Sequence, residues 1–185
     1  MFARLKHTLR GFQRDTSGSA STEAIIIGPA LIMALFTLMS FYEPYRAQSI
    51  AEKAAYTVSD MISRETLEIT PTYVTNMRNI YRDLSGLTNS ETALRITMLR
   101  WDETNDRFYI DWAKRRGDIP KLRNRDVKDY DDLLPQMVHN ERIILVETAS
   151  DFSPRISWGI GDRVIETFVY TRPRYAPQLV WSSGT

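Results

Sequence analysis

The sequence contains no cysteine and only two histidines among its 185 residues. The absence of cysteine excludes a disulfide-stapled scaffold, a zinc site built on thiolates and a cysteine nucleophile. The sequence also lacks the glycine pattern of a phosphate loop, the histidine pair of a metalloprotease and a nucleophile elbow. We therefore expect no metal and no cofactor, and a protein that is not an enzyme.

Neither sign of charge is in excess, because 24 lysines and arginines balance 23 acids to a net charge of +1. This balance gives no argument for a nucleic-acid partner, and we expect none. Hydrophobic residues make up 43% of the chain and charged residues 25%, which excludes a disordered, collagenous or multi-span protein. The length allows one ordinary domain with an appended segment.

The charges are unevenly placed at the N-terminus. Residues 1–18 carry four lysines and arginines against one acid, Asp15, and an uncharged run of nineteen residues occupies positions 24–42. About 20 such residues span a hydrocarbon core of about 30 Å as a helix, so we expect a transmembrane helix. The alternatives are a buried core helix, which would normally keep a polar stripe, and a cleaved secretory signal, whose apolar region is usually shorter.

The basic leader predicts the orientation of this helix. Lysine and arginine close to a membrane segment remain in the cytoplasm. We therefore expect a single-pass protein of the inner (cytoplasmic) membrane with its N-terminus in the cytoplasm and its C-terminal domain periplasmic or otherwise extracytoplasmic. The expected organisation is a basic leader over residues 1–18, a transmembrane helix over 19–43 and an extracytoplasmic domain over 44–185.

The junction between the leader and the apolar run carries a recognisable pattern. Residues 14–31 read RDTSGSASTEAIIIGPAL, with Gly18, Glu23 and Pro29 in order. This pattern resembles the N-terminal signature of the TadE/TadG-like family of Flp (type IVb, tight-adherence) pilus assembly proteins: a basic stretch, a Gly-Ser patch, a glutamate, five mostly apolar residues, a proline and a long apolar run. The resemblance covers residues 12–45 and returns near the end at VYTRPRY, residues 169–175. It departs from the family at Ala24, where an aromatic residue is frequent.

The resemblance implies a minor pilin (pseudopilin) or a membrane-anchored assembly factor of a tight-adherence pilus. Its partners would be the lipid bilayer, other pilins or pseudopilins, and the pilus assembly machinery. The resemblance also implies that a prepilin peptidase cuts after Gly18 and makes Ser19 the new N-terminus. The residues alone equally fit a helix-entry loop with Ser21 or Thr22 as the N-cap, so whether the leader is removed and whether the protein enters the fibre both stay open.

Three residues at or just before the start of the run, Glu23, Gly28 and Pro29, invite a role in subunit packing. An unpaired carboxylate buried between helices is strongly destabilising, so Glu23 would fix the register of one subunit against the next by pairing with the Ser19 amine of a neighbour. The alternative is that Glu23 simply faces water at the membrane edge. Pro29 removes a backbone donor and Gly28 loosens the same turn, which indicates either a point of unwinding during assembly or a simple kink.

The remaining sequence predicts an α+β fold. Helical spacing of apolar residues continues the transmembrane helix across Pro44 into a long amphipathic helix. A second helix runs from Tyr73 to about Leu84 and is closed by Gly86. We expect a small pilin-like domain with a mainly antiparallel sheet of about four strands. The expected inward positions of the first helix are Ala47, Ile50, Ala51, Ala54, Ala55, Val58, Met61 and Ile62. The expected strands are 92–101, 107–112, 142–148 and 163–171, with a five-residue turn at 102–106, a basic loop over 114–125 and a helix from Asp126 to about Val138 bent at Pro135.

Three polar or aromatic features invite a binding role, and each has a plainer interpretation. The acids Asp129, Asp131 and Asp132 lack the other ligands of a calcium loop, and the basic loop balances them as a solvated surface. His139 is expected at the surface, at the end of a helix. The aromatic residues Trp101, Tyr109, Trp112, Trp158 and Trp181 are expected in the core or at a subunit interface.

The alternative to a pilus function for the whole chain is a signal-anchored extracytoplasmic binding or sensing module unrelated to pili.

Overall fold

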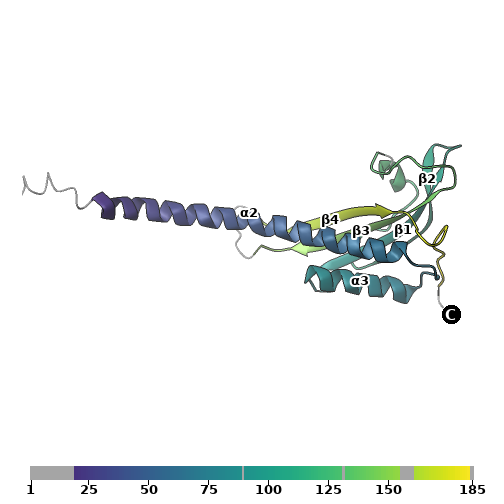
Figure 1. The fold of residues 1–185 in the computed structure, drawn as a ribbon, viewed down its shortest axis with the longest axis horizontal. Helices are drawn as coiled ribbons and strands as arrows, with labels where there is room; N and C mark the ends of the chain where they lie inside the picture. The colour runs from purple at the N-terminus through teal and green to yellow at the C-terminus, as the bar shows by residue number, and fades with distance from the viewer. Residues whose placement is uncertain (1–18, 89, 131, 155–160, 184–185) are drawn as a thin grey trace, which may run out of the picture.

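The computed structural model describes residues 19–88, 90–130, 132–154 and 161–183. The described part is a long helix followed by a small domain with a second helix and four strands, and the N-terminal half of the long helix projects away from this domain (Figure 1). The predicted class, a long apolar N-terminal helix joined to a small antiparallel α+β domain, is confirmed. The elements are α2 (Ser19–Ser63), α3 (Pro71–Ser85), β1 (Thr92–Asp102), β2 (Arg107–Arg116), the 3-10 helix η1 (Asp126–Tyr130), β3 (Arg142–Phe152) and β4 (Arg163–Thr171).

The helix α2 runs for 45 residues without a break, although Pro29 and Pro44 lie inside it. Each proline removes only one backbone donor, and apolar residues with helical spacing continue on both sides. The prediction of one helix that crosses Pro44 is therefore confirmed. Most of its predicted inward residues are buried or half-buried, but Met61 is 41% exposed, because α2 turns Ser59 and Ser63 toward the domain instead.

The second helix, α3, is closed by Gly86 as predicted, and at its N-terminus it is capped by Thr70, which was not predicted. The backbone N–H of Tyr73 donates to the Thr70 hydroxyl over 3.2 Å at the N-terminus. At the other end Gly86 adopts a left-handed conformation with φ of 72° and donates its N–H to the Arg82 carbonyl over 2.9 Å. Glycine adopts this conformation without the steric penalty that a Cβ brings.

The four strands form one antiparallel sheet in the order β2-β1-β3-β4. All four were predicted, but the pairing of Asp102 with Arg107 shortens the β1–β2 loop to residues 103–106. Strand β2 extends to Arg116 because Arg116 pairs with Leu94 near the start of β1, so residues 114–116 are not part of a basic loop. Strand β3 likewise extends to Phe152, because its residues from Ile144 to Phe152 pair with β4.

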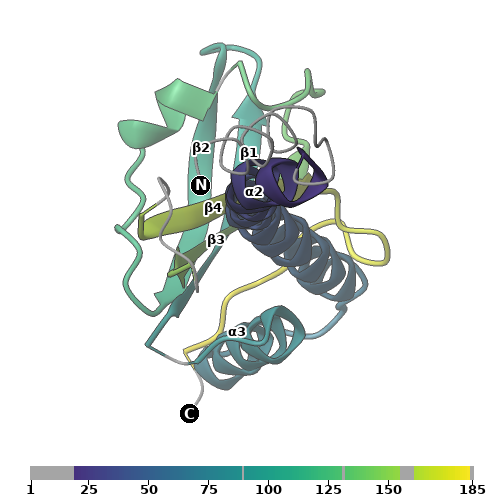
Figure 2. The ribbon, with the colours of Figure 1, turned by 90° about the vertical axis from the view of Figure 1, so that its left-hand side faces the viewer.

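Both faces of the sheet are covered, each by a different part of the chain (Figure 2). The helices α2 and α3 cover one face, where Val58 and Tyr81 pack with Ile96 and Val146. Residues 117–141 cover part of the other face, where the buried cluster is Leu99, Phe108, Leu122, Val127, Leu134, Met137, Ile143 and Leu145.

The prediction of a helix from Asp126 to about Val138 is wrong. Only Asp126–Tyr130 is helical, as a short 3-10 turn, and the chain then continues irregularly. Pro135 cannot donate a helical hydrogen bond, and the extended path lets Leu134 and Met137 both reach the sheet.

The C-terminal segment, residues 172–183, packs against the connection between α2 and α3. The N–H of Arg174 donates to the Ser63 carbonyl over 2.8 Å, and Ile69 pairs with Trp181 in an isolated parallel bridge. Leu179 is 3% exposed, and its carbonyl accepts the indole N–H of Trp112 over 2.8 Å. This segment is therefore part of the core.

Candidate membrane-anchoring and assembly surface

The N-terminal half of α2 is an apolar surface that no other described part of the chain covers. Only 6% of its most apolar stretch is buried, and the helix is long and apolar enough to cross a membrane. The alternative of a buried core helix is therefore wrong. The large exposed residues are Ile25, Ile26, Ile27, Leu31, Ile32, Met33, Leu35, Phe36, Leu38, Met39, Phe41 and Tyr42.

The two hydroxyl groups near the end of this run form hydrogen bonds inside the helix. The Thr37 hydroxyl donates to the Met33 carbonyl over 2.8 Å, and the Ser40 hydroxyl donates to the Phe36 carbonyl over 3.0 Å. In lipid an unsatisfied polar group costs several kcal/mol. These internal bonds make both side chains compatible with a hydrocarbon environment.

Gly28 and Pro29 form an open notch in the same surface. Apart from its chain neighbours and the backbone of the same helix, a Cβ on Gly28 would meet no described atom within 4 Å. Small residues in membrane helices let a neighbouring backbone approach closely. The ring of Pro29 also leaves the carbonyl of Ile25 without its usual helical donor. The notch therefore offers both close approach and a hydrogen-bond acceptor to a neighbouring helix.

The predicted processing and register residues lie at the N-terminal end of this surface. Gly18 and the rest of the leader lie outside the described residues. Ser19 is the first residue of α2, and Glu23 is exposed one turn further along the helix. Glu23 therefore lies on the surface of the helix, whereas cleavage after Gly18 and the pairing with Ser19 remain predictions.

The domain begins where the uncharged run ends. Phe41, Pro44, Tyr45 and Gln48 of α2 and residues 163–166 of β4 line a hollow of about 520 Å³. Tyr42 and Tyr45 are 64% and 75% exposed at this level. Tyrosine is enriched where membrane helices leave the hydrocarbon. The sequence did not indicate how directly the sheet follows the run, because that position depends on the contact between α2 and β4.

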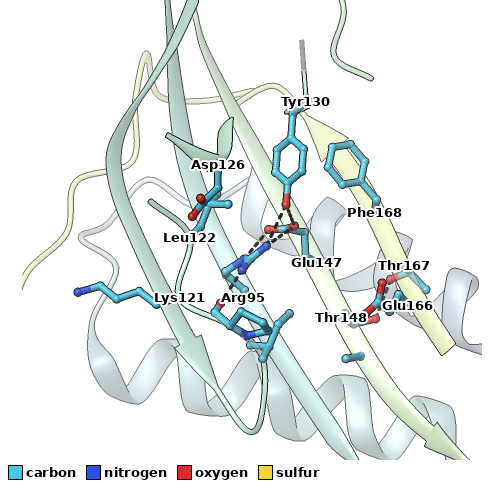
Figure 3. Close-up of a pocket in the computed structure, with 13 residues that line it drawn as sticks. Arg95, Lys121, Leu122, Asp126, Tyr130, Glu147, Thr148, Glu166, Thr167 and Phe168 are labelled. Carbon is cyan, nitrogen blue, oxygen red and sulfur yellow. Dashed lines mark hydrogen bonds and ion pairs between the residues drawn. The ribbon is translucent and has the colours of Figure 1, made fainter. Parts of the chain in front are cut away.

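A polar site, separate from the apolar surface, lies on the sheet face opposite α2, where an ion pair lines a hollow of about 420 Å³ (Figure 3). Arg95 Nε donates to Glu147 Oε2 over 2.6 Å, and the two side chains are 8% and 9% exposed. The Tyr130 hydroxyl donates to Glu147 Oε1 over 2.8 Å and accepts from Arg95 Nη2 over 3.1 Å. Arg95 Nη1 also donates to the Pro120 carbonyl. The cluster thus joins β1 and β3 to the segment that covers this face.

The electrostatics of this cluster favour a structural role. Burial raises the pKa of Tyr130 to about 12, and the hydrogen bond to Glu147 adds to the shift. The phenol therefore keeps its proton at neutral pH and remains a donor. Both Glu147 oxygens accept hydrogen bonds from Arg95 or Tyr130. This cluster was not predicted from the sequence, although Arg95 and Glu147 are each a charged residue in the middle of an apolar strand.

The other candidate polar residues are dispersed. His139 lies at the surface with its side chain 43% exposed, and its Nδ1 accepts the N–H of Glu103 over 3.3 Å. No helix ends there, because the predicted helix is absent. Asp132 is exposed, while Asp131 and the side chain of Asp129 lie outside the described residues. In the part of the chain that the structure describes, no group of three or more acidic or histidine side chains could hold a metal ion.

The predicted core aromatics are only partly enclosed. Trp112 and Trp181 pack against the core beneath α2 and α3, with ring centroids 6.0 Å apart. Trp101 packs on Phe108 at 4.7 Å on the other face. Tyr109 lies under the Arg107 guanidinium at 4.1 Å, and Trp158 lies outside the described residues.

No protein-family model, no curated protein and no solved structure matches this chain.

Proposed function

We propose that the chain is a membrane-anchored minor pilin, or an assembly factor, of a Flp-type tight-adherence pilus. The observation that carries the proposal is the exposed apolar half of α2, which continues without a break into the helix that covers the sheet. The resemblance of the Gly18–Glu23–Pro29 pattern to TadE-like proteins supports it. The proposal assigns the chain no enzymatic role, no cofactor and no nucleic-acid partner.

The proposed anchoring follows from length and charge. Nineteen uncharged residues at about 1.5 Å rise per residue cover about 28 Å, close to the thickness of a hydrocarbon core. The basic leader favours a cytoplasmic N-terminus, with the domain on the outer side of the inner membrane. The exposed tyrosines at positions 42 and 45 would then lie at the outer lipid boundary.

The proposed assembly step places two features in contact with a neighbouring subunit. Cleavage after Gly18 would free the Ser19 amine, and a neighbouring Glu23 carboxylate would pair with it. The cost of leaving either charge buried and unpaired would then select one register between helices. The notch at Gly28 and Pro29 would admit the neighbouring backbone at the same interface.

The N-terminal mass of the protein extracted from membranes tests the processing. In cells with an active prepilin peptidase we expect the mature chain to begin at Ser19. Replacing Gly18 with leucine should keep the leader attached and abolish incorporation into pili, because the peptidase needs a small residue at the cut. An intact leader on the natural chain would contradict the processing. A natural chain that keeps its leader and never enters pili, and whose membrane insertion G18L leaves unchanged, would instead favour a simple anchored binding module.

The role of Glu23 has its own test. Glu23→Ala should leave membrane insertion unchanged but prevent co-purification with other pilins, because the subunit register is lost. Glu52→Ala is the matched control, since Glu52 is an exposed carboxylate on the domain half of the same helix. Unchanged co-purification of E23A would remove the register role.

A further inference from the structure

The outer edge of β4 is an open strand edge. All nine residues of β4 pair with β3 on the inner side, from Phe152 opposite Arg163 to Ile144 opposite Thr171, with no shift of register. Among the described residues, none forms a hydrogen bond with the outer backbone edge of β4. An edge strand directs the N–H and C=O groups of alternate residues outward. Strand β4 therefore presents a template for another strand.

The opposite edge of the same sheet is protected. Strand β2 contains a bulge at Asp111, because Met98 pairs with Trp112 while Leu99 pairs with Ile110. The N–H of Ile110 donates to the Asn124 side chain over 3.0 Å. Bulges, covering segments and charged side chains are the usual devices that prevent edge pairing, and β2 carries Arg107, Lys114, Arg115 and Arg116 as well. Strand β4 has no proline and no bulge, and its charges are only Arg163 and Glu166.

Hollows on both faces of the sheet lie along the unprotected edge of β4. On the face opposite α2, the hollow of about 420 Å³ lies beside residues 166–168, and a second one of about 400 Å³ lies beside residues 170–172 together with Pro135 and Ile143. They are about four residues apart, or about 13 Å along a strand. On the other face, the hollow beside residues 163–166 lies next to α2. This arrangement fits an added strand whose side chains alternate between the two faces.

We propose that the outer edge of β4 docks an extended segment of a partner protein, which adds antiparallel to β4 as a fifth strand. Backbone hydrogen bonds would supply the affinity, and apolar side chains four residues apart would enter the two hollows and supply the specificity. The exposed side chains of Val164 and Tyr170, at 54% and 45% exposure, flank the added strand.

A second copy of this chain fits the edge less well, and this step rests on the proposed membrane anchoring. Strand β4 starts beside residues 41–48 of α2, and the chain that follows it reaches Ser63 at the C-terminal end of α2. It therefore runs in the same direction as α2. Two β4 edges can pair antiparallel only if the two α2 helices point in opposite directions, which chains anchored in one membrane with one orientation cannot do.

The test uses the full chain in detergent micelles and a synthetic peptide as the probe. The peptide alternates threonine and valine over the length of β4 and carries two phenylalanines four residues apart. We expect hydrogen exchange to show alternate β4 amides protected on peptide binding and β2 amides unchanged. N-methylation of one alternate set of peptide amides should abolish binding, while methylation of the other set should preserve it, because only one set faces β4.

Matched variants complete the test. Moving one phenylalanine by a single position, to the opposite face of the peptide, should weaken binding about tenfold, as expected for losing a packed aromatic contact. Tyr170→Lys should weaken binding, whereas Tyr56→Lys, at an exposed site on α2, should not.

Absence of β4 protection, or peptide binding that is unaffected by N-methylation, would overturn the proposal. Protection of alternate β4 amides in the free protein that rises with protein concentration would also overturn it and assign the edge to a second copy. Since no membrane or peptidase is needed, these outcomes are separate from those that test the proposed function.

Discussion

Arg95 of β1 and Glu147 of β3 lie opposite each other as register partners, and Arg95 Nε donates to Glu147 Oε2 over 2.6 Å. Both side chains are shielded from water, and Tyr130 bonds to both from the covering segment. A charge pair in this environment is costly to break, because the remaining charge stays buried without its partner. The pair therefore holds the covering segment on the sheet.

We expect Arg95→Ala to lower the free energy of unfolding by about 3–5 kcal/mol, the usual cost of leaving one member of a buried pair alone. The double variant Arg95→Met/Glu147→Leu should be less destabilised than R95A, because it leaves no unpaired charge. Urea denaturation followed by tryptophan fluorescence measures both. Arg64→Ala is the control, since Arg64 forms an exposed ion pair with Asp60 and should cost no more than about 1 kcal/mol. Equal losses for R95A and R64A would contradict the expectation.

The raised pKa of Tyr130 predicts a loss of stability in alkali. Its pKa is about 12 in the folded protein against an ordinary value of 10.0, so the unfolded chain loses this proton first as the pH rises. The contribution is fully present below pH 10 and is lost between pH 10 and about 12. Tyr130→Phe should therefore reduce the slope of unfolding free energy against pH in this window. Burial also raises the pKa of Tyr73 to about 12, so Y130F should keep part of the slope. If the slope of Y130F equalled that of the natural chain, the assignment of the effect to Tyr130 would be contradicted.

The C-terminal segment contributes Leu179 to the core, so truncating this side chain should destabilise the domain. Leu179→Ala removes a side chain that is 3% exposed and should cost about 2–5 kcal/mol. Val180→Ala is the neighbouring control, because Val180 is 47% exposed and such surface changes are usually within about 0.5 kcal/mol. Thermal unfolding followed by circular dichroism compares the two. A similar shift for both variants would show that the segment does not pack as described.

Two glycines with positive φ should respond differently to substitution. A Cβ at Gly117, with φ of 83°, would lie 2.5 Å from the Thr92 carbonyl oxygen and 2.7 Å from the Ala93 Cα. A Cβ at Gly86, with φ of 72°, would meet no atom within 4 Å. Gly86→Ala should therefore cost about 1–2 kcal/mol from the left-handed backbone alone, and Gly117→Ala clearly more. Denaturant midpoints with unchanged slopes would measure this difference, and the reverse order would refute it.

Local chemistry in the sequence was sufficient to predict much of the fold. The uncharged run and the closing Gly86 are local signals, and their helices were predicted close to their observed bounds. The turn at residues 102–106 likewise placed the first hairpin.

The errors concern contacts between distant segments. The helix expected after Asp126 is irregular chain because Leu134 and Met137 pack on a sheet built elsewhere in the sequence. Arg95 and Glu147 are 52 residues apart in sequence, so their pairing depends on the strand order, which no local pattern indicates. The open edge of β4 depends on the same strand order.

The unbroken path of α2 has a mechanical consequence. The same helix supplies the exposed apolar half and the residues that pack on β3 and β4, with no interruption at Pro44. Force or torque applied near Ser19 would thus reach the sheet directly, without a hinge to dissipate it. Any tilt of the apolar half would swing the whole domain as a lever, so the direction in which the β4 edge faces is coupled to the tilt of this helix.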